Sequence, residues 1–475
     1  MPFDDLRSFI RKVDEIGELR TIKGAHWNLE IGCIAELMAE RRGPALLFDE
    51  IVDYPAGYGV FVNAFTTLRR TALLFGLPLS YSGLEIVRAL HEKHRTFRPI
   101  PPVEVSDGPI FENKHFGDEV NLFEFPAPKW REFDGGRYIG TGCACIMRDP
   151  DEGWVNVGTY RVMIHDERTA GIKPSPGHDG YIILQKYRSQ HRNCPVAISL
   201  GQDPHLYYAS MASVPWGLSE YEYAGWLRGE PIKVVRGPLT GLPIPATSEI
   251  VIEGEIPPPD VELRYEGPFG EWTGYYGGGR MPRPVVKVKA IYHRNDPILL
   301  GNPFFKPPTP SILAIPQDAV GIWNELEAAG VPDVKGVWVL GSLLASPIIV
   351  VSIKQRFGGH AKQAGHIAAS CKAGGSTNRL VIVVDEDVDI TNAEEVLWAV
   401  VTRADFENID LISEGWSTPL DTSIQPEKRE RGDFTNTKLV INACRPYHRN
   451  DFPPVNKSSE ELRNRILSKF GQIFD

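Results

Sequence analysis

Residues 266–271 read Glu-Gly-Pro-Phe-Gly-Glu and place two carboxylates five residues apart across a Gly-Pro-Phe-Gly turn. The proline fixes its own φ, and the two glycines tolerate backbone angles that other residues avoid. We therefore expect a short, stiff turn rather than a piece of the core. Its role would be to hold the carboxyl groups of Glu266 and Glu271 in fixed positions.

Aromatic side chains flank both carboxylates, and we expect them to form apolar walls. They are Tyr265, Trp272, Tyr275 and Tyr276. Apolar walls exclude water from a carboxyl group and raise its pKa towards the range of a general acid or base, whereas a nearby cation keeps a second carboxylate ionised. The segment predicts an acid/base pair, and the alternative is two solvated acids in a surface turn.

Composition limits the class of protein. At 475 residues the chain is long enough for two or three domains, because single cores rarely exceed about 250–300 residues. A net charge of −10 without a basic stripe argues against nucleic acid as a partner. No apolar run reaches the about 20 residues that span a bilayer, and an acidic start at Asp4 and Asp5 is unlike a signal peptide. These features predict a cytoplasmic protein with no membrane partner.

Several common site motifs are missing from the sequence. The six cysteines are scattered without a CxxC pair, so neither a disulfide framework nor a zinc ribbon is predicted. There is no GxGxxG after a predicted strand, no GxxxxGK[ST] and no GxSxG. Nicotinamide, P-loop and α/β-hydrolase chemistry therefore lack their usual signals.

The first part of the chain, residues 1–108, has the pattern of a small α+β domain. Apolar residues at helical spacing predict a helix over 3–16, with Asp4 as its N-cap and Gly17 at its end. Short buried strands are expected at 45–48 and 59–62, followed by a helix over 84–93.

Residues 109–311 have short β segments separated by many glycines and prolines, which is typical of a barrel or sandwich. Helical stretches interrupt them at about 178–191 and 219–228. The expected strands are Cys143–Met147, Val155–Ile164, Ala197–Leu200, Ile250–Ile256 and Val285–Tyr292.

Residues 312–458 change to an α/β pattern, with a capping box expected from Thr391 to Glu394. The helices expected here are 312–329 and 359–371, and the strands are 337–340, 348–353 and 380–384. Four acids in the loop at 385–389 could ligate a metal, although loop and cap roles are the alternative. The last segment, 459–475, predicts an amphipathic helix that packs on its own protein or on a partner subunit.

Asn156 and Arg161 lie on one predicted strand, where a spacing of five puts them on opposite faces unless Gly158 permits a bulge. With a bulge they would share one pocket. An asparagine oxygen suits a hard divalent cation, and the planar fork of arginine suits a substrate carboxylate.

His178 and Glu220 each begin a predicted helical stretch. Taken singly, they are an exposed turn histidine and a first-turn acid that complements the helix dipole, and Glu222 competes with Glu220 for any functional role. Together with Asn156 they make a mixed nitrogen and oxygen set suited to Mn²⁺ or Mg²⁺, with positions left for water and a phosphate.

Five motifs in this order resemble the UbiD family of reversible decarboxylases, and the resemblance runs nearly the full length of the chain. The motifs are Asn156-x-Gly-x-Tyr-Arg161, His178, Ser219 to Gly225, Pro245 to Gly254 and Glu266 to Gly274. The resemblance implies an enzyme that uses prenylated FMN, with an N-terminal α+β domain, a central split β-barrel of flavin-reductase type and a C-terminal α/β domain used in oligomerisation. It implies a homodimer or homohexamer and a flavin prenyltransferase that supplies the cofactor.

The resemblance also implies roles for individual residues. The divalent metal, commonly Mn²⁺, would be held by Asn156, His178 and Glu220, and a K⁺ ion by Ser210, the backbone of Ala209, and Glu220. The cofactor contacts would come from Asn156, Val157, Gly158, Arg161, Gly177, His178 and Glu220. Some members have a Gln-His pair where this chain has Gly177-His178, and the second phosphate-binding lysine has no assigned position.

The implied reaction is a non-oxidative, reversible decarboxylation that passes through a covalent adduct of cofactor and substrate and releases CO₂. Arg161 would orient the substrate carboxylate, Glu266 would hold Arg161, and Glu271, with a raised pKa, would donate the proton that replaces CO₂.

Residues 271–279 resemble the branch that acts on aromatic and heteroaromatic acids, and residues 304–308 are expected to line the substrate pocket. Two alternatives remain. One is a non-catalytic flavin-binding subunit of a multi-subunit carboxylase, and the other is a glycosidase that uses Glu266 and Glu271 as its carboxylate pair.

Overall fold

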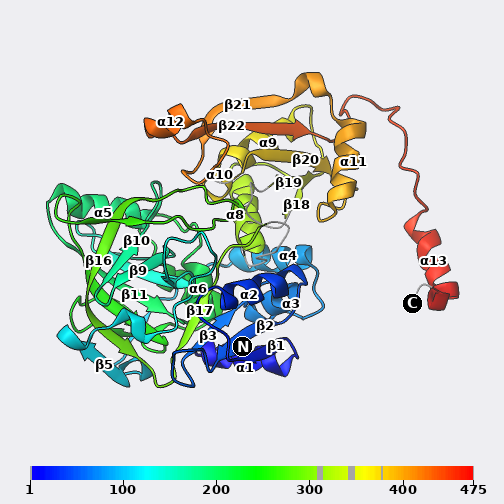
Figure 1. Ribbon diagram of the computed structural model, residues 1–475. Coiled ribbons are helices and arrows are strands. Elements are labelled where there is room, and N and C mark those ends of the chain that lie inside the picture. The colour runs from blue at the N-terminus through cyan, green and yellow to red at the C-terminus, as the bar shows by residue number, and fades with distance from the viewer. Residues whose placement is uncertain (1–2, 307–313, 341–347, 376–377, 474–475) are drawn as a thin grey trace.

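The computed structural model describes residues 3–306, 314–340, 348–375 and 378–473. Helices and strands alternate in several parts of the chain, which confirms a mixed α/β, multidomain fold. Four sheets with four, ten, three and five strands lie in this described portion (Figure 1).

The N-terminal sheet has the strand order β1-β2-β3-β17. Its strands are β1 (Leu19–Lys23), β2 (Ala45–Asp49), β3 (Gly59–Val62) and β17 (Ile298–Gly301). The last strand comes from far along the chain and pairs parallel with β3. The helices of this part are α1 (Leu6–Glu15), α2 (Glu30–Glu40), α3 (Leu68–Leu74) and α4 (Gly83–His94).

The first helix forms as expected, but its predicted N-cap is wrong by one residue. Asp5 caps α1, and its carboxylate accepts a hydrogen bond of 2.8 Å from the backbone N–H of Ser8. Asp4 instead forms an ion pair of 2.8 Å with Arg228. Gly17 follows the helix with φ of 73°, a conformation that glycine adopts at low cost.

The ten-stranded sheet follows the path β6-β9-β10-β16-β14-β11-β7-β8, and β5 and β15 also pair with β16. The two ends of this path, β6 and β8, pair with no further strand of the described chain, so hydrogen bonding does not close the sheet into a barrel. Its strands are β5 (Asn113–Phe116), β6 (Tyr138–Gly140), β7 (Cys143–Arg148), β8 (Val155–Gly158), β9 (Val162–Asp166), β10 (Thr169–Ile172), β11 (Cys194–Leu200), β14 (Ile250–Ile256), β15 (Leu263–Glu266) and β16 (Met281–His293).

Helices and a small sheet accompany this large sheet. The helices are α5 (Asp179–Ser189), α6 (Pro204–Ala209) and α7 (Glu220–Arg228), and the small sheet, in the order β13-β12-β4, consists of β13 (Pro243–Pro245), β12 (Lys233–Arg236) and β4 (Val103–Glu104). The expected helices over 178–191 and 219–228 are thereby confirmed.

The C-terminal sheet has the order β18-β19-β20-β22-β21. Its strands are β18 (Val334–Leu340), β19 (Ile348–Ile353), β20 (Leu380–Asp385), β21 (Asp410–Trp416) and β22 (Thr435–Asn442), and its helices are α8 (Ala314–Ala328), α9 (His360–Ser370), α10 (Lys372–Gly375), α11 (Ala393–Arg403) and α12 (Pro426–Glu430). The expected start of α8 at 312 lies outside the described residues.

Two expectations for this part are settled by side-chain contacts. Asn392, rather than Thr391, caps α11, and its side chain accepts a hydrogen bond of 3.0 Å from the backbone N–H of Glu394. In the acidic loop, Asp387 forms an ion pair of 2.8 Å with Arg403. This acid therefore stabilises the end of α11, as the loop alternative predicted.

The C-terminal helix α13 (Glu460–Phe470) forms, but none of its residues is buried. Figure 1 shows it at the end of an extended segment, apart from the rest of the chain. The expected packing on its own protein is therefore wrong, and packing on a partner subunit stays a prediction. No helix in the described ranges combines the length and apolar character that crossing a membrane requires.

Hydrophobic packing joins the parts of the chain. Val60 of β3 belongs to the same buried cluster as Ile198 of β11. Ile86 of α4 shares a second cluster with Leu326 of α8 and Val350 of β19. The N-terminal residues thus pack against both the large sheet and the C-terminal part.

A close backbone approach at Gly32 provides a test of this packing. A Cβ atom at Gly32 of α2 would lie 1.9 Å from the backbone oxygen of Trp130. Gly32→Ala should therefore lower the free energy of unfolding by about 1–3 kcal/mol, because the carbonyl belongs to a rigid backbone and must shift. Denaturant unfolding measures this change. Gly471→Ala, which meets no atom within 4 Å, is the matched control and should have no such effect.

Candidate active site

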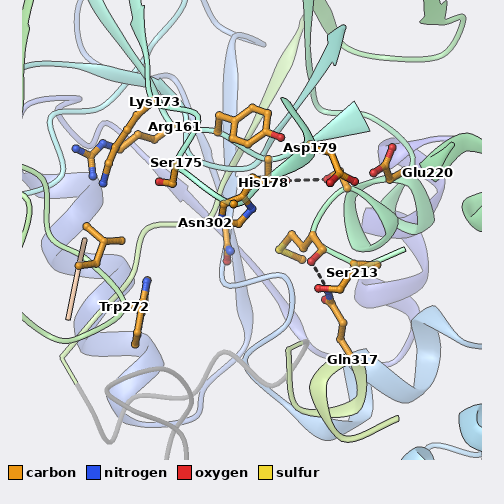
Figure 2. Close-up of a pocket in the computed structure, with 18 of the residues that line it drawn as sticks. Arg161, Lys173, Ser175, His178, Asp179, Ser213, Glu220, Trp272, Asn302 and Gln317 are labelled. Atoms are coloured by element: carbon orange, nitrogen blue, oxygen red, sulfur yellow. Dashed lines mark hydrogen bonds between the residues drawn. The ribbon is translucent and has the colours of Figure 1, made fainter. Parts of the chain in front are cut away.

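A cavity of about 350 Å³ lies between the large sheet and the C-terminal part (Figure 2). It brings together most of the predicted site residues. Those that line it are Asn156, Gly158, Arg161, Gly177, His178, Ser210, Glu220 and Glu271. Val157, Ala209 and Glu266 are not among the lining residues. Val157 contacts the lining residue Glu220, and Glu266 contacts the lining residue Arg161.

Arg161 is held by Glu266 in a two-pronged ion pair. Its Nε and Nη2 atoms donate hydrogen bonds of 2.7 and 2.8 Å to the two carboxylate oxygens. Tyr138 donates a third, of 2.8 Å, to Glu266. Burial by itself raises the pKa of Glu266, but the Arg161 guanidinium reverses that effect and holds the pKa below its ordinary value. Glu266 is therefore an ionised anchor for Arg161.

Glu271 contacts two cations at the cavity wall. Its Oε1 atom accepts a hydrogen bond from Nη1 of Arg161 and lies 3.4 Å from Nζ of Lys173. The side chains of Arg161, Glu266 and Glu271 are 9%, 1% and 5% exposed. Two carboxylates, the Arg161 guanidinium and the Lys173 amine are thus buried together, and the guanidinium is the group that stays charged there.

One expectation about the 266–271 segment is wrong, and a second is confirmed only in part. All of its residues are buried except the half-buried proline, so the segment belongs to the core. Of the four aromatic residues expected to form walls, Tyr265 and Tyr275 are 60% and 65% exposed and form none, whereas Trp272 lines the cavity. The ring that packs beside the acids is Phe269, whose centroid lies 4.3 Å from that of Tyr138. Of the two glycines, only Gly267 has a positive φ, of 87°.

Asn156 and Arg161 do share one pocket, but the predicted bulge at Gly158 is not the cause. The expected strand over 155–164 is interrupted, because β8 ends at Gly158 and β9 begins at Val162. Residues 159–161 therefore leave the sheet and change the face to which the following side chains point.

Glu220 is buried beside Asn156 at one end of the cavity. Its carboxylate accepts a hydrogen bond of 3.0 Å from the amide of Asn156 and one of 2.6 Å from the backbone N–H of Val157. Burial raises the pKa of Glu220 to about 8. A buried carboxyl with so few donors is stabilised as the anion by a cation, so these residues fit a metal ion.

The other candidate metal ligands are His178 and the two acids Glu220 and Glu222. His178 precedes α5, makes no capping hydrogen bond and lies at the cavity wall together with Asp179 and Glu220 (Figure 2). Glu222 instead accepts a hydrogen bond of 3.0 Å from the backbone N–H of Ser219 and caps α7. Only Glu220 of these two acids lines the cavity.

Ser210 also lines the cavity and is already hydrogen-bonded. Its hydroxyl donates to the carbonyl of Tyr207 at 2.8 Å and lies 2.7 Å from that of Thr159. The carbonyl of Ala209 accepts from the N–H of Ala212 at 2.9 Å. Both oxygens keep a free lone pair, so each could also ligate a monovalent cation.

Several residues of the cavity have no counterpart in the sequence predictions. Lys173 comes directly before the turn that carries His178, and this position was the signal that could have identified it. Burial lowers its pKa well below the ordinary value of lysine. Asp318, Lys372, Trp416 and Leu420 come from the C-terminal part. No local pattern connects them with the site, because only the tertiary fold brings them there.

Three domain models of one family match the chain in order. The 3-octaprenyl-4-hydroxybenzoate carboxy-lyase N-terminal domain matches residues 10–90. The Rift-related domain of the same description matches residues 102–307, and the C-terminal domain matches residues 312–443.

Curated relatives match over nearly the whole length. A phenolic acid decarboxylase of Bacillus subtilis is 33% identical over 463 residues, which covers 94% of this chain and 93% of that protein. A pyrrole-2-carboxylic acid decarboxylase of Pseudomonas aeruginosa is 33% identical over 466 residues, with 93% and 91% covered.

Solved structures agree with this result. The closed form of the vanillic acid decarboxylase of Sedimentibacter hydroxybenzoicus has a TM-score of 0.88 at 29% identity, with both chains fully covered. The UbiD-class enzyme HmfF of Pelotomaculum thermopropionicum in complex with FMN has a TM-score of 0.83 at 27% identity, with 98% of this chain and 100% of that chain covered. With three family domains in order and relatives at 33% identity over 93–94% of its length, the chain belongs to the UbiD family of carboxy-lyases.

Proposed function

We propose that the protein is a non-oxidative, reversible decarboxylase of an aromatic or heteroaromatic carboxylic acid that uses prenylated FMN. The observation that carries this proposal is a cavity in which one arginine, fixed by a buried carboxylate, meets a second carboxylate at the wall. Arg161 supplies the cation for a substrate carboxylate, and Glu271 supplies a group that can carry a proton.

The family membership and the donor set support the cofactor. HmfF has also been solved with prFMN, as an evolved dimeric form. When bound, prenylated FMN accepts the electron pair that the substrate releases with CO₂. The residues proposed to hold it are Asn156, Val157, Gly158, Arg161, Gly177, His178 and Glu220. Lys173 and Lys372 both line the cavity, and Lys372, whose charge affects the pKa values of His178 and Asp179, is the candidate for the phosphate-binding lysine.

Two cations would complete this site. Asn156, His178 and Glu220 are proposed to hold Mn²⁺ or Mg²⁺, because a neutral oxygen, an imidazole and a buried carboxylate face one end of the cavity. Ser210, the carbonyl of Ala209, and Glu220 are proposed to hold K⁺. Both ions would neutralise the charge that accumulates when Glu220 and a phosphate are close together.

Substrate binding would separate Glu271 from Arg161. A substrate carboxylate at Arg161 takes the position that Glu271 has beside the guanidinium. A carboxyl group that loses a cation partner keeps its proton more readily. Substrate binding would thus prepare Glu271 to donate a proton to the carbon that has lost CO₂, while Glu266 keeps Arg161 in place.

The two alternative functions have less support. A glycosidase needs one carboxyl as an acid and the other as a nucleophile or base. Here Arg161 and Tyr138 engage Glu266, which leaves that carboxylate no open approach. A non-catalytic subunit would not require Arg161, Glu266 and Glu271 in this arrangement.

The substrate class follows from the relatives. Proteins at about one-third identity act on phenolic acids and on pyrrole-2-carboxylic acid, so a hydroxybenzoate or a five-membered heteroaromatic acid is proposed. Of the residues expected to select the substrate, Phe304 lines the cavity, Phe305 and Lys306 do not, and positions 307 and 308 lie outside the described residues.

The finer architecture is also a proposal. It divides the chain into 1–108, 109–311, 312–458 and the helix 459–475, with a split β-barrel of flavin-reductase type in the second part. We also propose that the protein is a homodimer or homohexamer, that it is cytoplasmic, and that a flavin prenyltransferase supplies its cofactor. The exposed apolar side of α13 supports an oligomer, because that face has no partner within the described chain.

Reconstitution tests the proposed reaction. The protein is co-expressed with a flavin prenyltransferase and screened for CO₂ release across hydroxybenzoic, furoic and pyrrole carboxylic acids. A modified-flavin absorbance spectrum, bound Mn²⁺ and turnover of at least one such acid are expected. A colourless, metal-free protein that cleaves glycans would contradict the proposal.

Glu271→Gln tests the proton donor. The amide keeps the shape of the side chain but cannot donate an acidic proton, so kcat should fall by about 100-fold or more at unchanged cofactor content. Steady-state kinetics and the flavin spectrum measure both quantities. Glu262→Gln, the same change at an ion pair outside the cavity, is the control and should leave kcat unaltered. Full turnover in the Glu271 variant would refute its assigned role.

Glu220→Gln and Glu222→Gln separate the two candidate metal ligands. The first change removes a charged ligand at the cavity and should weaken Mn²⁺ binding by about 100-fold or more, since even a ligand's supporting partner is worth 10–100-fold. The second removes only a helix cap and should leave binding nearly unchanged. Mn²⁺ titration followed by electron paramagnetic resonance measures both affinities, and the reverse order would overturn the assignment.

A further inference from the structure

Three potential metal ligands meet outside the cavity described above. His115 lies on β5, His293 ends β16, and Glu124 ends the short 3₁₀ helix Leu122–Glu124. In the portion that the structure describes, these residues form the group of three whose ligand atoms all lie within 4.8 Å of one another. None of them lines the cavity.

The spacing of the three ligand atoms fits a tetrahedral metal ion. The Nε2 atoms of His115 and His293 are 3.1 Å apart, and Oε1 of Glu124 lies 3.4 Å from His293 and 3.8 Å from His115. Zinc binds imidazole nitrogen at about 2.0–2.1 Å and carboxylate oxygen at about 2.0–2.2 Å, which gives edges of roughly 3.4 Å between tetrahedral ligands. All three separations are close to that value.

Surrounding groups orient two of the ligands. Nδ1 of His293 lies 2.8 Å from the carbonyl oxygen of Arg294, an acceptor, so in the neutral ring this nitrogen carries the proton and Nε2 has the lone pair that a metal would take. The hydroxyl of Tyr58 donates to Oε1 of Glu124 at 3.3 Å. Hydrogen bonds of this kind fix the tautomer and the carboxylate of metal ligands in proteins.

A cation resolves an unfavourable contact within the group. When the His293 ring is neutral, its Nε2 lone pair faces the carboxylate oxygen of Glu124 at 3.4 Å, and these two acceptors repel each other unless a proton or a metal ion lies between them. His293 is only 4% exposed, so water screens this contact poorly. His115 can donate one proton towards His293 but cannot satisfy the carboxylate as well.

We propose that His115, Glu124 and His293 form a binding site for a divalent transition metal of the zinc type. Two imidazoles and one carboxylate are a common ligand set for Zn²⁺, and a water molecule would take the fourth position. The side chains of His115 and Glu124 are 28% and 24% exposed, which gives the ion a path from solvent.

The metal would connect separate parts of the fold. His115 and His293 are on neighbouring strands, with His115 opposite Ile291 in the pairing of β5 and β16. Glu124 belongs to the loop that follows β5, and Tyr58 directly precedes β3 of the N-terminal sheet. One ion would therefore fasten an edge of the large sheet, that loop and the N-terminal sheet to one another.

Zinc binding by the full-length protein tests this site. Protein stripped with EDTA is incubated with Zn²⁺, passed through a desalting column and analysed for metal content and thermal midpoint. The wild-type protein should retain one more zinc ion than His115→Ala, and the affinity of that ion should fall at least about 100-fold in the variant, as expected for loss of one of three ligands. Zinc should also raise the thermal midpoint of the wild type more than that of the variant.

Matched variants keep the test decisive. His191→Ala removes an exposed histidine that also lies beside a single carboxylate, Asp260, and should retain the wild-type zinc content. Glu124→Gln should lose the same ion as His115→Ala, and it replaces His115→Ala if that variant does not fold. The proposal is overturned if the wild type, His115→Ala and Glu124→Gln retain equal amounts of zinc with equal affinity.

Discussion

The burial of Arg161 is the constraint on which the candidate site depends. A guanidinium remains charged in a protein, so an arginine that is 9% exposed requires a carboxylate at hydrogen-bonding distance. Glu266 meets this need with two hydrogen bonds, and Glu271 adds a third from another direction. Removal of one partner from such a group leaves an uncompensated charge, which costs roughly 3–5 kcal/mol. The ion pairs therefore fix the backbone that carries them.

This constraint explains the local backbone around the cavity. Arg161 can reach Glu266 because the chain leaves the sheet between β8 and β9, so that the residue no longer follows the alternation of the strand. Gly267 follows Glu266 with a φ of 87°, and a Cβ atom there would lie 2.5 Å from the backbone oxygen of Gly279. The turn is thus shaped by the need to present two carboxylates to one guanidinium.

The sequence was informative wherever local pattern determines structure. Alternation and turn residues predicted the strands of the large sheet. The five motifs in order predicted one site, and the cavity brings together its residues Asn156, Arg161, His178, Glu220 and Glu271. Burial of the 266–271 segment was not predictable, because it depends on Tyr138 and Lys173, which are distant in sequence. The caps were shifted by one residue, since neighbouring polar side chains have nearly equal capping ability.

The C-terminal wall of the cavity shows why glycine recurs near the site. A Cβ atom at Gly177 would lie 3.0 Å from the ring of Trp416, and one at Gly277 would lie 2.9 Å from the backbone oxygen of Leu420. Both glycines therefore let the C-terminal part approach the large sheet, and Trp416 and Leu420 line the cavity as a result. The glycines of the 274–279 segment cannot be understood from turn chemistry alone. At Gly277 the absence of a side chain serves a contact between two parts of the chain, and this contact shapes the pocket in which a substrate would bind.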